Sequence, residues 1–126
     1  MVWDASGQQL AMAAADSDSL FIATRQHAVL RRLATVPKGS GRLAGLAADV
    51  DGGWWSALRG GWSVVRFGAD GSVARVVALP VPSPSGVAFG GSQGDLLYVT
   101  SAREPVTRES LEAAPLSGRL FSFHPV

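Results

Sequence analysis

The side chains that could carry out chemistry are few and scattered along this sequence. Two carboxylates stand close together at Asp49 and Asp51, directly before Gly52, in a pattern slightly like a calcium-binding loop. Such a loop needs further oxygen ligands and a distal glutamate at a fixed spacing, and none follows here. Asp-Gly pairs are common in turns, because aspartate bonds its own backbone and glycine accepts positive φ. We therefore interpret Asp49 to Gly52 as a turn between strands.

A serine and two histidines are the candidates for nucleophilic chemistry. Ser101 with His27 or His124 would supply a nucleophile and a base, since an imidazole can take the hydroxyl proton. No spacing connects these residues, and such a pair is recognised by geometry rather than by sequence. The absence of cysteine excludes disulfides, cysteine-bound zinc and thiol nucleophiles. The sequence therefore assigns no catalytic residue and no metal ligand.

Two further patterns have a structural interpretation that we prefer. The run Lys38-Gly39-Ser40-Gly41 resembles a phosphate loop only in composition, because it lacks the full Walker spacing, and we predict a connecting loop there. Trp54, Trp55 and Trp62 could form an aromatic binding surface. Adjacent residues of a strand point to opposite faces, so at least one of Trp54 and Trp55 should pack in the interior.

The composition excludes several classes of partner. Hydrophobic residues make up 47% of the chain and charged residues 17%, which is too apolar for intrinsic disorder. The 11 basic residues nearly balance the 10 acidic ones, so we expect no nucleic-acid partner and no acidic membrane surface. We see neither a signal-peptide pattern nor an apolar run long enough to span a bilayer, and expect a cytoplasmic protein.

An internal repeat determines the predicted fold. The step from Gly7 to Gly52 and the step from Ala47 to Ala88 both fall in the range of roughly 40–50 residues that four-stranded propeller blades occupy. Each unit has the same order: a small-residue strand, a glycine turn and an apolar strand. The predicted strands cover residues 2–5, 10–14, 20–24, 28–34, 45–49, 54–58, 63–67, 72–79, 86–89, 96–101 and 120–124.

The repeat predicts an all-β chain, a partial β-propeller of about three four-stranded blades, half of a six-bladed ring. We place the blades at about 1–42, 43–83 and 84–126. The last blade lacks a fourth strand and carries one short helix over 107–114, with Thr107 as N-cap, Glu109 in the first turn and Pro115 as the stop. An open arc exposes blade faces and strand edges, which favours pairing with something else.

Several blocks of this sequence have a family-specific character. They run over residues 45–55, 64–67, 79–82 and 115–121, together with the Phe89-Gly90-Gly91 block and the run from Tyr98 to Arg103, of which these last two are the most specific. The blocks resemble the C-terminal half of the regucalcin/gluconolactonase (senescence marker protein) family. The resemblance implies a six-bladed propeller that holds a divalent cation, such as Ca²⁺ or Zn²⁺, in its channel and hydrolyses lactones or similar esters.

The resemblance also implies where this chain departs from the family. The family's Pro-Asp-Gly motif, which carries a metal-binding aspartate and probable base, reads Leu43-Ala44-Gly45 here. Alanine offers no oxygen to a hard cation. The family's other two ligands, an Asn and a Glu, would fall before Met1, so we expect no cofactor in this chain alone. Ser85 stands in the next blade where Ala44 stands in this one; it could face the channel, but a turn role is favoured.

Three hypotheses follow from these expectations. The first is a truncated lactonase-like propeller with weak or absent activity. The second is a homodimer, or an assembly with another chain, that closes a six-bladed ring whose channel could bind a lactone or a metal, with Ser85 and Asp49 among the few candidate residues. The third is a non-catalytic binding module that recruits a partner by strand addition.

Overall fold

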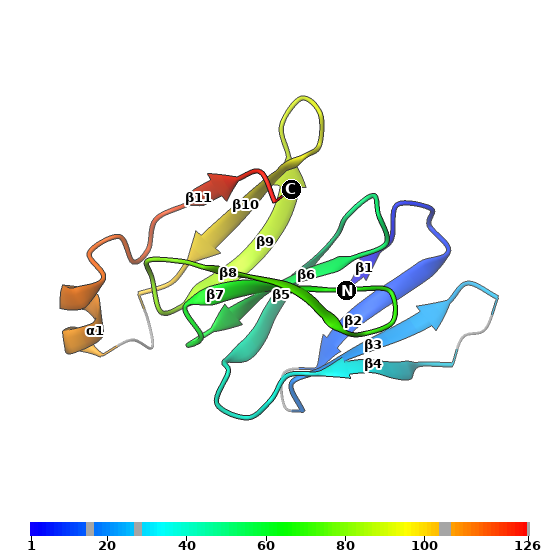
Figure 1. The fold of residues 1–126 in the computed structure, drawn as a ribbon, viewed down its shortest axis with the longest axis horizontal. Helices are drawn as coiled ribbons and strands as arrows, with labels where there is room; N and C mark the ends of the chain where they lie inside the picture. Colours follow the sequence, from blue (N-terminus) through cyan, green and yellow to red (C-terminus); the bar gives the residue numbers. More distant parts are fainter. Residues whose placement is uncertain (15–16, 27–28, 104–106, 126) are drawn as a thin grey trace.

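The computed structural model describes residues 1–14, 17–26, 29–103 and 107–125, which form three antiparallel sheets and one short helix (Figure 1). Blade 1 contains β1 (Val2–Trp3), β2 (Gln9–Ala14), β3 (Ser19–Thr24) and β4 (Arg31–Thr35). Blade 2 contains β5 (Arg42–Ala48), β6 (Trp54–Arg59), β7 (Ser63–Phe67) and β8 (Val73–Ala78). Blade 3 contains β9 (Pro84–Gly90), β10 (Leu96–Ser101) and β11 (Phe121–Phe123).

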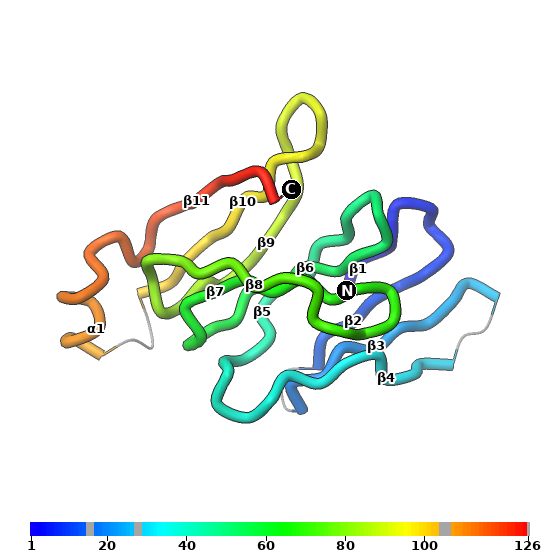
Figure 2. Tube along the Cα trace, viewed as in Figure 1, coloured from blue at the N-terminus to red at the C-terminus, as the bar shows by residue number. Residues whose placement is uncertain are grey.

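Within each sheet the strands pair in the order of the chain, as expected for meandering blades. Figure 2 follows the trace through blade 1, then blade 2, then blade 3, with blade 2 between the other two. The predicted all-β arrangement of three sheets is therefore confirmed. In the described part of the chain, the sheet of blade 3 has three strands, as predicted, and β11 lies at its edge.

The predicted strand limits agree best in two strands that are rich in strand-favouring residues such as valine. The strands over 63–67 and 96–101 have the predicted bounds. The first strand ends at Trp3 rather than at residue 5, because the Asp4 carboxylate starts a turn. Its Oδ1 accepts hydrogen bonds from the amides of Gln8 (3.0 Å) and Gln9 (3.1 Å). The strand predicted over 28–34 runs over Arg31–Thr35, and residue 28 lies outside the described residues.

The helix α1 (Arg108–Ala113) lies between β10 and β11, as predicted. Thr107 is its N-cap, and its hydroxyl accepts a hydrogen bond from the amide of Ser110 at 3.2 Å. Glu109 lies in the first turn, where a carboxylate interacts favourably with the helix dipole. No helix in the described residues is long and apolar enough to cross a bilayer.

Two separate apolar cores hold the blades together, and adjacent residues of β6 supply one indole to each. Trp54 is 2% exposed and packs with Leu20 and Ile22 between blades 1 and 2. Trp55 is 1% exposed and packs with Leu97 and Val99 between blades 2 and 3. The alternation of side chains along the strand thus places the two rings on opposite faces of blade 2. The prediction that at least one packs in the interior holds for both, whereas Trp62 is 39% exposed.

We call the first strand of each blade, β1, β5 or β9, its inner strand. The inner strands of blades 2 and 3 approach each other very closely. A Cβ atom on Gly45 of β5 would lie 3.0 Å from the Cα of Gly86 in β9. Gly45 also has a φ of 75° and lies within a register shift of the β5–β6 pairing between Ala44 and Ala47. Only glycine meets both conditions without strain. The close contact between blades 2 and 3 therefore explains why glycine stands at positions 45 and 86.

Candidate functional site

The inner strands form one wall of the molecule and line a groove. A hollow of about 270 Å³ lies between Val2 to Ala5, Leu46 to Ala48 and Val87 to Phe89. Because Gly45 contacts Gly86 while the later residues of both strands share this groove, β5 and β9 run in the same direction. The starts of the inner strands therefore meet at one end of the wall, and the turns that follow them meet at the other end.

The start of the inner strands carries hydroxyl groups and no carboxylate from β5 or β9. Ala44 contributes a methyl group there. Ser85 in β9 is half-buried, and its Oγ lies 2.9 Å from the Oγ1 of Thr100 in β10. The two hydroxyls satisfy each other, with either oxygen as donor. Sequence reasoning identified Ser85 but missed Thr100, although the pairing of a β9–β10 hairpin brings the two together.

Ser101 has a structural role. Its hydroxyl donates to the carbonyl of Arg119 at 2.6 Å and accepts from the amide of Gly118 at 3.0 Å. These two bonds tie the segment after α1 to the end of β10. A serine engaged in this way is not oriented toward a base.

The hypothetical pair of Ser101 and His124 is not assembled. Phe123 pairs with Leu97 near the start of β10, so His124 lies at the opposite end of blade 3 from Ser101. Five residues of strand correspond to roughly 16 Å. The Nδ1 of His124 instead lies 3.7 Å from the Oδ2 of Asp95, and both side chains are exposed. His27 lies outside the described residues.

The candidate calcium loop is a turn, and its first carboxylate is fully used. The Oδ1 of Asp49 accepts from the amides of Asp51 (2.9 Å) and Gly53 (2.8 Å). Its Oδ2 accepts from the indole Nε1 of Trp55 at 3.0 Å and from the Nε of Arg66 at 2.6 Å. Burial alone would raise the pKa of Asp49, but the hydrogen bonds from these four residues outweigh it and hold that pKa below its usual value.

Sequence reasoning missed Arg66 as the partner of Asp49. The residues are far apart in sequence, but Trp55 and Arg66 are direct cross-strand neighbours on β6 and β7. The side chain of Arg66 is 23% exposed, and its pKa is raised, mainly by the hydrogen bond to Asp49. The run from Lys38 to Gly41, by contrast, connects β4 to β5 as predicted.

Comparison of the sequence with known proteins shows the family of this chain. Residues 3–103 match the SMP-30/Gluconolactonase/LRE-like region. The chain belongs to this family. The 6-deoxy-6-sulfogluconolactonase of Pseudomonas putida is 44% identical over 100 residues, which are 79% of this chain and 33% of that protein. The L-arabinolactonase of Azospirillum brasilense is 39% identical over 92 residues, which are 73% of this chain and 30% of that protein.

Solved structures give the same fold. Regucalcin from Agrobacterium tumefaciens, described as a calcium-binding protein, superposes with a TM-score of 0.88 at 22% identity, over 96% of this chain and 43% of that one. The β-propeller domain of Cps50 (Swd1) from Myceliophteria thermophila superposes with a TM-score of 0.60 at 19% identity, over 79% of this chain and 30% of that one. The predicted partial propeller is therefore confirmed. The chain spans about a third of the length of the lactonases that it matches.

The described residues do not fit the cation that the SMP-30/gluconolactonase family implies. In the described part of the chain, no three His, Cys, Asp or Glu side chains gather closely enough to hold a metal ion. At the start of the inner strands, Ala44 supplies no oxygen, and the hydroxyls of Ser85 and Thr100 bind each other. A hard cation such as Ca²⁺ takes six to eight oxygens, several of them from carboxylates.

Proposed function

We propose that this chain is a lactonase-type propeller segment that hydrolyses lactones weakly or not at all on its own residues. Its family membership and its two lactonase relatives support the lactonase origin. The observation that carries the proposal is Ala44. It stands where the resemblance puts a metal-binding carboxylate, at the start of β5, where β5 lies beside β9.

The chemistry of lactone hydrolysis explains why this position matters. A lactone carbonyl must be polarised, and a water molecule must lose a proton as it attacks. A methyl group can do neither. The nearby Ser85–Thr100 pair keeps one O–H group to donate and lone pairs to accept, which is enough to orient a bound polar molecule but not to activate water.

The proposal is tested by measuring lactone hydrolysis with a pH indicator. The substrates are gluconolactone, 6-deoxy-6-sulfogluconolactone and L-arabinolactone, each with and without added Ca²⁺, Zn²⁺ or Mn²⁺. We expect the rate to lie at or only slightly above the uncatalysed rate in every case. A metal-dependent rate many-fold above the uncatalysed one, which grows in proportion to protein concentration and disappears with a chelator, would contradict the proposal.

Restoring the carboxylate provides the companion test. The variant Ala44→Asp should remain inactive and should bind Ca²⁺ no more tightly than about 1 mM, because a single carboxylate supplies too few of the required oxygens. Titration calorimetry measures this affinity. Micromolar binding would mean that further ligands stand near residue 44 and that the site is closer to completion than proposed.

A second candidate is a non-catalytic binding module that forms one part of a closed ring. The favouring observation is the three-stranded sheet of blade 3, in which β11 has a free edge within the described residues. A strand from another chain or a second copy can pair with such an edge. The mass of the protein in solution separates this candidate from an isolated segment.

A further inference from the structure

A second hollow lies at the far end of the inner strands, away from Ala44. It is a cleft of about 420 Å³ between blades 2 and 3, bounded by the turn after β5, the loop after β9 and the outer strand β8. Five residues separate Ala44 from Asp49, which is roughly 16 Å along a strand. Because of this separation, the cleft is distinct from the end of the inner strands where Ala44 lies. Its volume is in the range of small-molecule sites.

The cleft combines an apolar interior with charged walls. Trp55 and Phe89 line it, and the ring of Trp55 is held in place by its bond to Asp49. Trp55 also contacts Phe123 edge to face, with ring centroids 6.5 Å apart. A rigid aromatic surface of this kind suits an apolar group of limited size.

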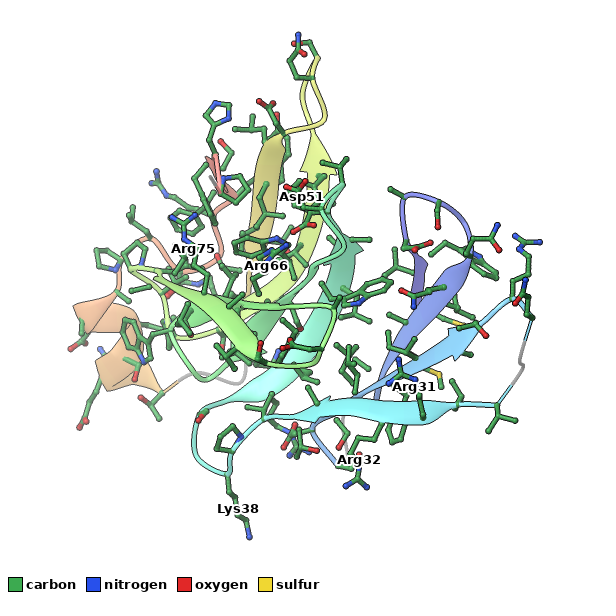
Figure 3. All side chains as sticks on the ribbon, turned by 45° about the vertical axis from the view of Figure 1, so that its right-hand side comes forward. Arg31, Arg32, Lys38, Asp51, Arg66 and Arg75 are labelled. Carbon is green, nitrogen blue, oxygen red and sulfur yellow. The ribbon has the colours of Figure 1, made fainter. Side chains whose placement is uncertain are left out.

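The blade 2 wall carries two cations, of which only one is neutralised by a carboxylate of the described residues. Arg66 and Arg75 are direct cross-strand neighbours on β7 and β8, and both line the cleft (Figure 3). Like charges at such positions repel each other. Asp49 neutralises Arg66 through a short ion pair. Arg75 is exposed, and no carboxylate of the described residues lies within 4.0 Å of its side-chain nitrogens.

Two carboxylates on the rim have the opposite charge. Asp51 lies on the turn after β5, near Arg66 in Figure 3, and Asp95 lies on the loop after β9 in blade 3. The contact of Asp95 with His124 is long, at 3.7 Å, and exposed, so it stabilises little. A simple anion would meet Arg75 but would be repelled by Asp51 and Asp95. A ligand that carries both a negative and a positive group can place each of them beside a side chain of opposite charge.

We propose that this cleft binds a small zwitterion with an apolar side group, of the α-amino-acid class. The carboxylate pairs with the guanidinium of Arg75, the ammonium group with Asp51 or Asp95, and the apolar group lies against Phe89. Guanidinium–carboxylate pairs of this kind are charge-assisted and bidentate, which gives orientation as well as affinity.

Three probes of matching shape test the proposal by titration calorimetry with the full chain. They are L-phenylalanine, 3-phenylpropanoate, which lacks the ammonium group, and phenethylamine, which lacks the carboxylate. We expect saturable binding of L-phenylalanine and about tenfold weaker binding of each of the other two, because each loses one charge-assisted contact. Equal affinities for all three probes, or no saturable binding of L-phenylalanine, would overturn the proposal.

Variants assign the two charged walls separately. Arg75→Gln should weaken L-phenylalanine about tenfold and leave phenethylamine unchanged. The double variant Asp51→Asn/Asp95→Asn should weaken L-phenylalanine by a similar factor and leave 3-phenylpropanoate unchanged or tighter. Arg31→Gln, on exposed β4 of blade 1, is the matched control and should change nothing. Because these side chains are exposed, the variants should fold, which a thermal melt verifies; if they fold and bind like the parent chain, the assignment is wrong.

Discussion

Asp49 shows how a single carboxylate organises the turn between the first two strands of blade 2. It accepts hydrogen bonds from two backbone amides, an indole and a guanidinium. Its side chain is only 14% exposed, so most of these bonds are shielded from water. At the level of sequence the same residue was a candidate ligand. Its bonds instead fix the ring of Trp55 and neutralise Arg66, and thereby shape one wall of the cleft.

Replacing this carboxylate should therefore cost substantial stability. In Asp49→Asn, the amide nitrogen that replaces one oxygen would face the donors of Trp55 or Arg66 and leave them unpaired. We expect a loss of about 2 kcal/mol in the free energy of unfolding, measured by urea titration. Asp51→Asn, at an exposed carboxylate two positions away, is the control and should cost much less.

The same pair of proteins, the parent chain and Asp49→Asn, predicts a pH dependence. The pKa of Asp49 is depressed in the folded state, so its ionised form stabilises the fold above the unfolded pKa near 3.8. This stabilisation is lost as the pH falls from there through the depressed folded pKa. The difference in stability between the two proteins should be constant above about pH 5 and shrink below about pH 4. A difference that stays constant down to about pH 2 would mean that Asp49 contributes no charge-dependent stability.

At the scale of elements, two glycines with similar φ angles allow the cost of backbone strain to be measured separately from the cost of a packing clash. Gly45 (φ 75°) faces the backbone of Gly86, whereas a Cβ on Gly52 (φ 84°) would meet no atom within 4 Å. Gly52→Ala should cost about 1 kcal/mol for the left-handed backbone alone. Gly45→Ala should cost about 3 kcal/mol, since it also forces β5 and β9 apart. Equal losses in urea titrations would show that the close approach of the inner strands contributes nothing.

The elements were predictable from sequence to the extent that local patterns decide them. The strands Ser63–Phe67 and Leu96–Ser101 have the predicted bounds because strand-favouring residues predominate in them. The capped helix was predictable because Thr107 and Pro115 mark its ends. The first strand was predicted too long, since a side-chain-to-backbone turn at Asp4 competes with the strand pattern.

The candidate site was less predictable, for a physical reason. The start of the inner strands follows from the repeat and from the family motif, so Ala44 and Ser85 were identified. The cleft joins residues from Ala48 to Pro125. Its shape depends on how two sheets pack, and no local periodicity encodes the charge of Arg75 on one wall together with that of Asp95 on the other.

At the scale of the whole molecule, the open faces of the arc predict association. Trp3 on blade 1 is 47% exposed and Leu120 beside β11 is 62% exposed. A second copy related by a two-fold axis can cover the outer faces of blades 1 and 3 and form a ring of six blades. We predict a mass in solution of twice 13.1 kDa, measured by light scattering after size-exclusion chromatography. A folded monomer at high concentration that binds no hydrophobic dye would contradict this prediction.

The adjacent indoles of β6 carry a consequence for how the chain avoids misfolding. Trp54 fills the space beside blade 1, and Trp55 fills the space beside blade 3. A hairpin that slipped by one residue would turn each ring to the opposite face of blade 2, and at least one of the two spaces would lose its indole. The correct register of β6 is thus stabilised independently by its packing against two different blades.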